Sequence, residues 1–290
     1  MRIPIFLLLP AAIFTFTSGC RDGSAELLHE KPVGQPTLEL PDAMTMLFGN
    51  FDVKTQSSTA LMEDKSATKH DRKPMIVRSL FRTGTIQAGE QRLVLVTYSV
   101  PRGETFDCHQ CSPTIGMAVF SQSQRHWSVE ASDASVTESG SWGRPPTNVQ
   151  LLQIGPERQA IQIREVYRGG GETTTILQVL VPWKGGIRLG LYRVISDDDL
   201  GGCGDPELLP CYSNRRTLNF IPMGEAEYYD VELRLAGTDL PESDTLPANK
   251  ARVVRGLEIL TFQDGKYVRA SRRGDVTSED HFVGGGEDVQ

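Results

Sequence analysis

The chain has 290 residues, enough for one large domain or two small ones, and 39% of them are hydrophobic. It carries 30 Lys and Arg against 37 Asp and Glu, which gives a formal net charge of −7. No basic stripe interrupts this acidic balance, so both nucleic-acid binding and electrostatic adsorption to anionic lipid are disfavoured.

The first twenty residues are organised like an export signal. Arg2 supplies one positive charge, residues 3–16 are apolar, and small residues follow before Cys20. The apolar run is shorter than the roughly 20 residues of a membrane-spanning helix, and Pro4 and Pro10 interrupt it. This pattern predicts a cleavable signal peptide over residues 1–19. A plain secretory signal and an uncleaved anchor are the alternatives.

The end of this leader resembles the lipobox of bacterial lipoprotein precursors. Thr17-Ser18-Gly19-Cys20 has the small residues and the cysteine of that motif, with Thr17 where Leu is usual. The resemblance implies that the Cys20 thiol receives a diacylglycerol and that acyl chains such as palmitate hold the mature protein on a membrane. Arg21, rather than Asp, follows the cysteine. In such precursors this favours the periplasmic face of the outer membrane over the inner membrane.

The rest of the chain divides into a tether, a domain and a tail. Residues 20–40 contain the lipidation site and a polar, Pro-containing tether, residues 41–269 a β-rich domain, and residues 270–290 a polar, Gly-rich tail predicted to be disordered. Pro41 and Gly49 bracket a short predicted helix. Residues 54–73 are polar and predict a loop.

From about residue 75 onward, short β-prone runs alternate with turn signals. Within residues 160–195, three such runs are joined by Gly-rich turns, and Asp264-Gly265 predicts a type I′ hairpin turn. The pattern predicts a mainly β fold of about 10–12 antiparallel strands with little helix. It would be a sandwich or a barrel-like meander, with a propeller-like stack as the alternative.

Four cysteines remain after Cys20, namely Cys108, Cys111, Cys203 and Cys211. An even number in an oxidising compartment predicts two disulfides, for which three connectivities exist. Pairing of neighbours, Cys108 with Cys111 and Cys203 with Cys211, is the simplest arrangement. The Cys-His-Gln-Cys segment resembles segments of uncharacterised envelope proteins. A metal site or a redox pair at this segment is the alternative to a structural bridge.

An acidic run supplies the best candidate metal ligands. Asp197, Asp199 and Asp205 offer carboxylate oxygens from a flexible loop, which suits weak calcium binding. Their spacing matches no EF-hand, and a solvated acidic turn is the alternative. The sequence predicts no other cofactor.

No residue pattern specifies a reaction. Gly140-Ser141-Trp142-Gly143 lacks the nucleophile elbow of hydrolases and predicts a turn. Trp127, Trp142 and Trp183 are expected to pack in the core, with a carbohydrate-stacking platform as the alternative.

The sequence therefore predicts a lipid-anchored envelope protein whose β-rich domain binds another envelope protein or peptidoglycan. An enzyme is the less favoured reading. An envelope hydrolase with an unrecognised site and a Cys-x-x-Cys metal or redox protein remain the alternatives.

Overall fold

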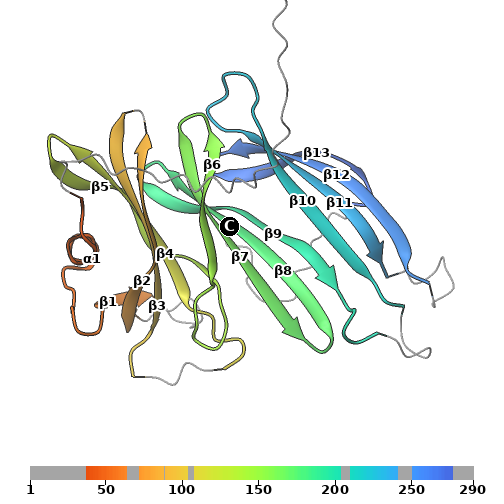
Figure 1. The fold of residues 1–290 in the computed structure, drawn as a ribbon, viewed down its shortest axis with the longest axis horizontal. Coiled ribbons are helices and arrows are strands. Elements are labelled where there is room, and N and C mark those ends of the chain that lie inside the picture. Colours follow the sequence, from red (N-terminus) through yellow and green to blue (C-terminus); the bar gives the residue numbers. More distant parts are fainter. Residues whose placement is uncertain are drawn as a thin grey trace, which may run out of the picture. The chain divides into compact units, whose positions relative to one another are not determined.

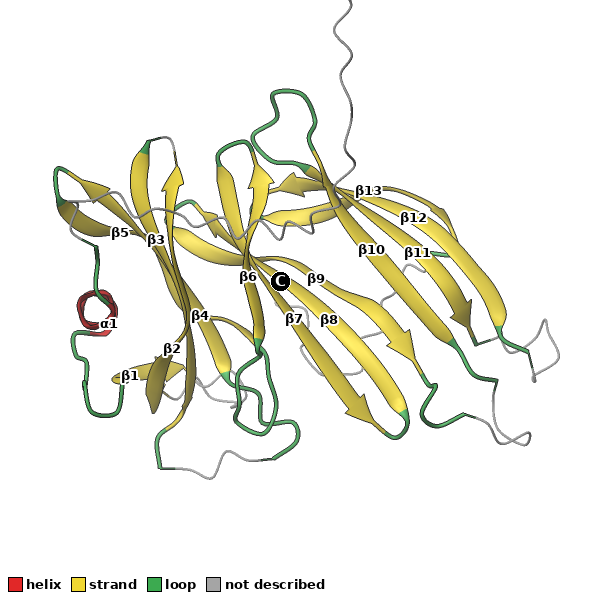
Figure 2. Ribbon diagram, viewed as in Figure 1, coloured by secondary structure: helices red, strands yellow, loops and turns green. Residues whose placement is uncertain are grey.

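The computed structural model describes residues 37–63, 72–87, 89–103, 108–203, 210–240 and 250–276. Within these ranges, one helix, α1 (Leu40–Phe48), precedes thirteen strands (Figure 2). The strands form two antiparallel sheets, so the prediction of a mainly β fold is confirmed. Neither α1 nor any other part of the described chain forms a helix long and apolar enough to span a bilayer.

The first sheet has five strands in the order β1-β2-β3-β4-β5 (Figure 1). They are β1 (Ser58–Glu63), β2 (Arg72–Gln87), β3 (Glu90–Pro101), β4 (Thr114–Ser123) and β5 (His126–Glu138). Each strand pairs with its neighbour in sequence. Gln124 and Arg125, with φ of 48° and 70°, form the two-residue turn between β4 and β5, and such primed turns match the twist of the strands they join.

The second sheet has eight strands in the order β13-β12-β11-β10-β9-β8-β7-β6, and it curls into a half-barrel. They are β6 (Asn148–Gly155), β7 (Arg158–Gly169), β8 (Glu172–Trp183), β9 (Gly186–Asp198), β10 (Ser213–Ile221), β11 (Asp230–Asp239), β12 (Arg252–Gln263) and β13 (Lys266–Gly274). Strands β7 to β9 are the predicted meander. Asp264 and Gly265, with φ of 47° and 85°, form the predicted β12–β13 hairpin turn.

An apolar layer joins the two sheets. Strands β3, β4 and β5 contribute Val96, Ile115 and Ala131, among others, and strands β7 and β8 contribute Ile161 and Leu180. Two stacked sheets with a shared core exclude the propeller-like alternative. A second cluster fills the concave side of the half-barrel, where Val179, Val231 and Leu260 are among its members.

Helix α1 covers the other face of the first sheet. Its buried Ala43 and Met44 pack in a cluster with Leu95 and Phe120. Gly49 ends the helix with a left-handed φ of 73°, and its N–H donates to the Thr45 carbonyl at 2.8 Å. The predicted helix is confirmed.

Three predicted boundaries are wrong. Residues 54–73 contain β1 and the start of β2, because a short edge strand can be polar. The domain begins before residue 41, since Leu38 packs in the helix cluster. Strand β13 continues to Gly274, so the polarity of residues 270–274 reflects an exposed edge strand. The predicted signal peptide, Cys20 and residues 277–290 lie outside the described residues.

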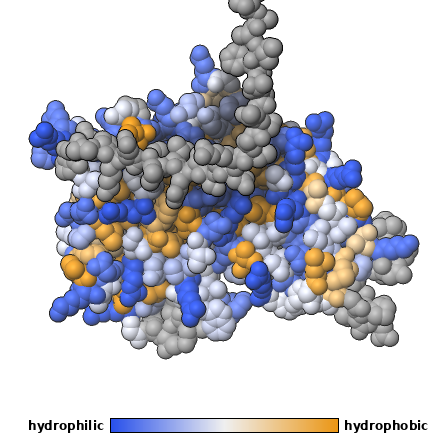
Figure 3. Space-filling model, viewed as in Figure 1, coloured by the Kyte–Doolittle hydropathy of each residue, from blue (hydrophilic) through white to orange (hydrophobic). Residues whose placement is uncertain are grey.

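Apolar side chains on the surface are mostly dispersed. On the face that Figure 3 shows, hydrophobic and hydrophilic residues are interspersed over the described domain. Exposed side chains such as Leu61, Ile86 and Val253 come from different strands. Such scattering is normal for a protein surface.

Candidate functional site

A groove with a volume of about 630 Å³ lies beside strand β9. Asp133, Ser135 and Val136 of β5 line one side, residues 187–193 of β9 the centre, and Lys266 and Tyr267 of β13 the other side. Sites for small ligands typically measure about 300–1,000 Å³, so this groove is large enough to bind one.

A bulge in β9 shapes the centre of the groove. Leu189 pairs with Leu180 and Leu191 pairs with Val179, so Gly190 is an extra residue in β9. One extra residue in a strand moves the side chains that follow it to the opposite face of the sheet. Leu189 accordingly packs in the core between the sheets, whereas Leu191 packs in the half-barrel core. Residues 189–191 thus line the groove while Leu189 and Leu191 pack in two different cores.

A bulge in β5 shapes the opposite side. Ile115 pairs with Thr137 and Met117 with Asp133, which places residues 134–136 opposite Gly116 alone. A Cβ on Gly116 would lie 2.7 Å from the Ala134 carbonyl oxygen, so this close approach requires glycine. Bulges often re-aim side chains beside functional sites.

Along the groove, one edge of strand β9 has no strand partner among the described residues. Strand β8 pairs along its whole length, but β10 pairs only with Ser196, Asp197 and Asp198. Arginine side chains cover part of this edge: Arg193 Nη1 donates to the Tyr192 carbonyl at 2.9 Å, and Arg216 Nη1 donates to the Val194 carbonyl at 2.8 Å. These arginine contacts are at residues 192 and 194, so they do not involve residues 187–191 of the same edge.

Positive charge predominates in the groove. Arg188 and Lys266 are exposed and Arg193 is partly buried, whereas Asp133 is the carboxylate among the described lining residues. This local balance is opposite in sign to the net charge of the whole chain. The groove therefore suits an anionic ligand.

A buried carboxylate holds Arg193 in place. Glu258 is 2% exposed, and its Oε1 lies 2.6 Å from Arg269 Nε and 3.6 Å from Arg193 Nη2. A buried carboxylate is costly unless it is paired and hydrogen-bonded. The two arginines provide that pairing from strands β13 and β9.

Two tyrosines with neutral phenols line the groove. Burial raises the pKa of Tyr192, and the charge of Glu165 raises it further. Burial also raises the pKa of Tyr267, with smaller contributions from Tyr228 and Asp230. Both phenols are therefore neutral at physiological pH and can donate a hydrogen bond. The Tyr267 hydroxyl is buried without a hydrogen-bond partner among the described residues.

A smaller cavity of about 30 Å³ lies between the sheets, next to the ion pair of Arg92 and Glu130. That volume is about the share of one water molecule in the liquid. The cavity is too small for an organic ligand, so the groove is the better candidate site.

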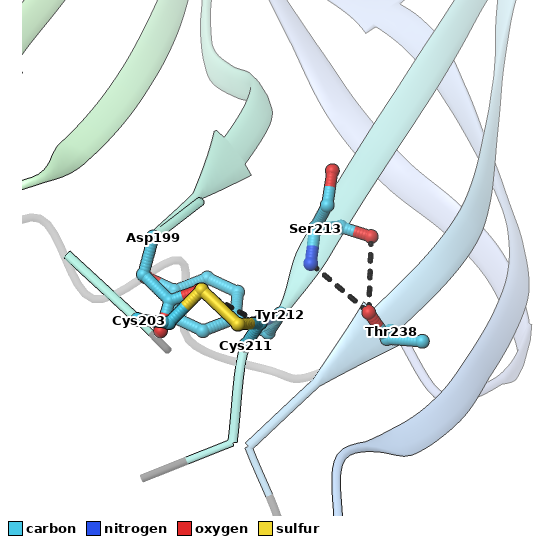
Figure 4. The surroundings of a disulfide bond; sticks show 6 residues. All are labelled: Asp199, Cys203, Cys211, Tyr212, Ser213 and Thr238. Atoms are coloured by element: carbon cyan, nitrogen blue, oxygen red, sulfur yellow. Dashed lines mark hydrogen bonds between the residues drawn. A yellow bond between two sulfur atoms is a disulfide. The ribbon is translucent and has the colours of Figure 1, made fainter. Parts of the chain in front are cut away.

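The four predicted disulfide cysteines form the two local pairs. Cys108 is bonded to Cys111 before β4, and Cys203 is bonded to Cys211 between β9 and β10. Figure 4 shows the second bridge beside Asp199 and Tyr212. None of the four cysteines lines the groove.

The acidic run is engaged by its own chain. Asp197 accepts hydrogen bonds from Thr174 Oγ1 at 2.8 Å and from the Tyr212 hydroxyl at 3.3 Å, and Asp199 accepts one from the Tyr212 N–H at 2.7 Å. Asp205 lies outside the described residues. Across the described part of the chain, no three His, Cys, Asp or Glu side chains converge on a metal position. Calcium binding here remains a prediction.

The tryptophans have three different environments. Trp127 packs against the helix cluster. Trp183 makes edge contacts with Tyr228 and Phe262, with ring centroids 6.0 and 5.3 Å away. Trp142 is 52% exposed, which contradicts its expected place in the core. It lies in the predicted turn after β5.

Comparison of the chain with protein-family models, with curated proteins and with solved structures finds no match. The groove was not predicted from the sequence. Its charged residues Arg188 and Lys266 belong to strands that are distant in the chain, and only the curl of the second sheet brings them to one site.

Proposed function

We propose that this protein is a lipid-anchored component of the bacterial envelope and that its β domain binds an acidic, extended segment of a partner protein in the groove. The observation that carries the binding proposal is the combination of an open β9 edge with Arg188 and Lys266 beside it. The leader and Cys20 support the location. The two disulfides fit an oxidising compartment.

An extended peptide fits the groove better than a compact anion. A strand that adds to a sheet edge gains main-chain hydrogen bonds, and pockets for alternate side chains give specificity. Residues 187–191 have no described strand partner on the side away from β8, and Arg188 and Lys266 line the groove at this stretch. A small anion would use the cations alone and leave the unpaired edge of β9 without a partner.

The anchor is tested by lipid labelling. Cells grown with a palmitate analogue should label the wild-type protein, and Cys20→Ala should abolish the label because no other described or predicted site would accept a diacylglycerol. The variant should also move from the membrane fraction to the soluble envelope fraction. An unlabelled wild-type protein would refute the lipid anchor.

The groove is tested with a fluorescein-labelled peptide of alternating Glu and Val, using fluorescence anisotropy. The Arg188→Glu/Lys266→Glu variant should bind it about tenfold more weakly, because attraction becomes repulsion, and the difference should shrink at high salt. Arg215→Glu is the matched control: it reverses an exposed β10 arginine outside the groove and should bind like the wild type.

Three results would overturn the peptide proposal. One is equal binding of a Lys–Val peptide, which would show that charge is not recognised. Another is unchanged binding by the groove variant. The third is preference for phosphatidylglycerol vesicles over the peptide, which would assign the groove to a lipid surface instead.

A further inference from the structure

The turn that holds Trp142 has a conformation that disfavours this residue. Trp142 has φ of 54°, in the left-handed region that bulky side chains rarely adopt. Its side chain is nevertheless 52% exposed, so core packing does not explain why a tryptophan occupies the position. Backbone strain of this kind persists where the surrounding structure enforces it, and it concentrates at functional sites.

The Cys108–Cys111 loop enforces this conformation. The Trp142 N–H donates to the Cys108 carbonyl at 3.1 Å, and the Gly143 N–H donates to the Cys111 carbonyl at 2.8 Å. Ser141 and Arg144 close the turn through reciprocal main-chain hydrogen bonds of 3.1 and 2.9 Å. The disulfide thus fixes the two carbonyl acceptors that hold the tryptophan backbone.

A buried carboxylate, that of Glu165, holds the turn by accepting hydrogen bonds from it. Glu165 is 8% exposed and accepts hydrogen bonds from Ser139 Oγ at 2.7 Å and from the Gly140 N–H at 2.6 Å. Ser112 Oγ donates to the Gly140 carbonyl at 2.6 Å, which ties the turn to the disulfide loop. A Cβ on Gly140 would collide with the Arg144 carbonyl oxygen, so the tight return of the chain requires glycine.

A polar ring lies against the indole. The His109 ring stands perpendicular to it, with ring centroids 5.6 Å apart, and His109 is itself exposed. Gln110 and Arg144, which follow His109 and Gly143 in the chain, are exposed too. A protein-binding hot spot would instead lie in a well-packed pocket that becomes fully desolvated in the complex. An exposed aromatic ring beside an imidazole that can form hydrogen bonds suits a pyranose, which has an apolar C–H face and polar hydroxyl edges.

We propose that Trp142 is a stacking platform for one sugar ring of a glycan, held ready by the Cys108–Cys111 loop. The site does not depend on the groove. The Trp127→Phe/Trp183→Phe protein keeps Trp142 as its one tryptophan. Titration with the tetramer of N-acetylglucosamine should change its fluorescence saturably.

Two variants separate binding from folding. Trp142→Gly should lower the affinity about tenfold or more, as expected for the loss of one stacked ring. It should leave the melting temperature unchanged or higher, because glycine adopts positive φ without strain. Trp142→Phe should keep part of the affinity. The Arg188→Glu/Lys266→Glu groove variant should bind the sugar like the wild type.

Unchanged fluorescence at millimolar sugar would refute the platform. So would a Trp142→Gly protein that binds as tightly as the wild type. A lower melting temperature of that variant, with unchanged affinity, would assign Trp142 a purely structural role.

Discussion

Glu258→Ala will lower the free energy of unfolding by about 3 kcal/mol, toward the low end of the range for a broken buried ion pair because both arginines are partly exposed. The carboxylate is almost fully buried and lies within 4 Å of guanidinium groups from two strands, Arg193 on β9 and Arg269 on β13. Without it, two positive charges face each other inside the half-barrel and lose their acceptor. Urea unfolding followed by circular dichroism measures the loss.

Glu227→Ala is the matched control for this prediction. Glu227 also pairs with an arginine, Arg158, but both side chains are about half exposed. Exposed pairs contribute about 0–1 kcal/mol, so this variant should unfold close to the wild type. Equal losses for Glu227→Ala and Glu258→Ala would show that burial does not govern the Glu258 pair.

Glu165→Ala will lower the free energy of unfolding by about 2–4 kcal/mol, because the Ser139 hydroxyl and the Gly140 N–H both lose a buried acceptor. The same change should loosen the Trp142 turn above it. In the protein whose only tryptophan is Trp142, the indole should therefore become more accessible to acrylamide quenching. Differential scanning calorimetry and quenching measure the two effects on one sample.

Glu157→Ala, in the exposed turn between β6 and β7, is the control for Glu165→Ala. It should change neither the unfolding free energy nor the quenching. If Glu165→Ala leaves the quenching unchanged, the disulfide loop alone holds the turn, and the anchoring role assigned to Glu165 is wrong.

Features encoded by a few adjacent residues were predictable from the sequence. Asp264-Gly265 specifies a hairpin because both residues adopt positive φ at low cost. Pro41 and Gly49 set the ends of α1 in the same local way. Strand β11 is also locally encoded, since its buried Val231 and Leu233 alternate with polar residues, as a strand with one buried face requires.

The groove depends on how strands that are distant in sequence pack together, which the sequence alone does not show. The bulge at Gly190 forms because β9 must pack against both cores, and the bulge opposite Gly116 depends on the packing of β5. The burial of Glu165 also depends on a distant segment. A charged residue in β7 would be expected at the surface, and it is the turn that contains Ser139 that buries this carboxylate. Interactions between distant segments decide these positions.

The sequential pairing of the strands also bears on how the chain can assemble. Among the described strands, each hydrogen-bonded neighbour within a sheet is also a neighbour in sequence. Closing short loops costs little entropy, and such topologies favour fast folding. A polypeptide that is synthesised from its N-terminus can complete β1 to β5 before β6 is available. Folding of the first sheet then need not wait for the strands of the second.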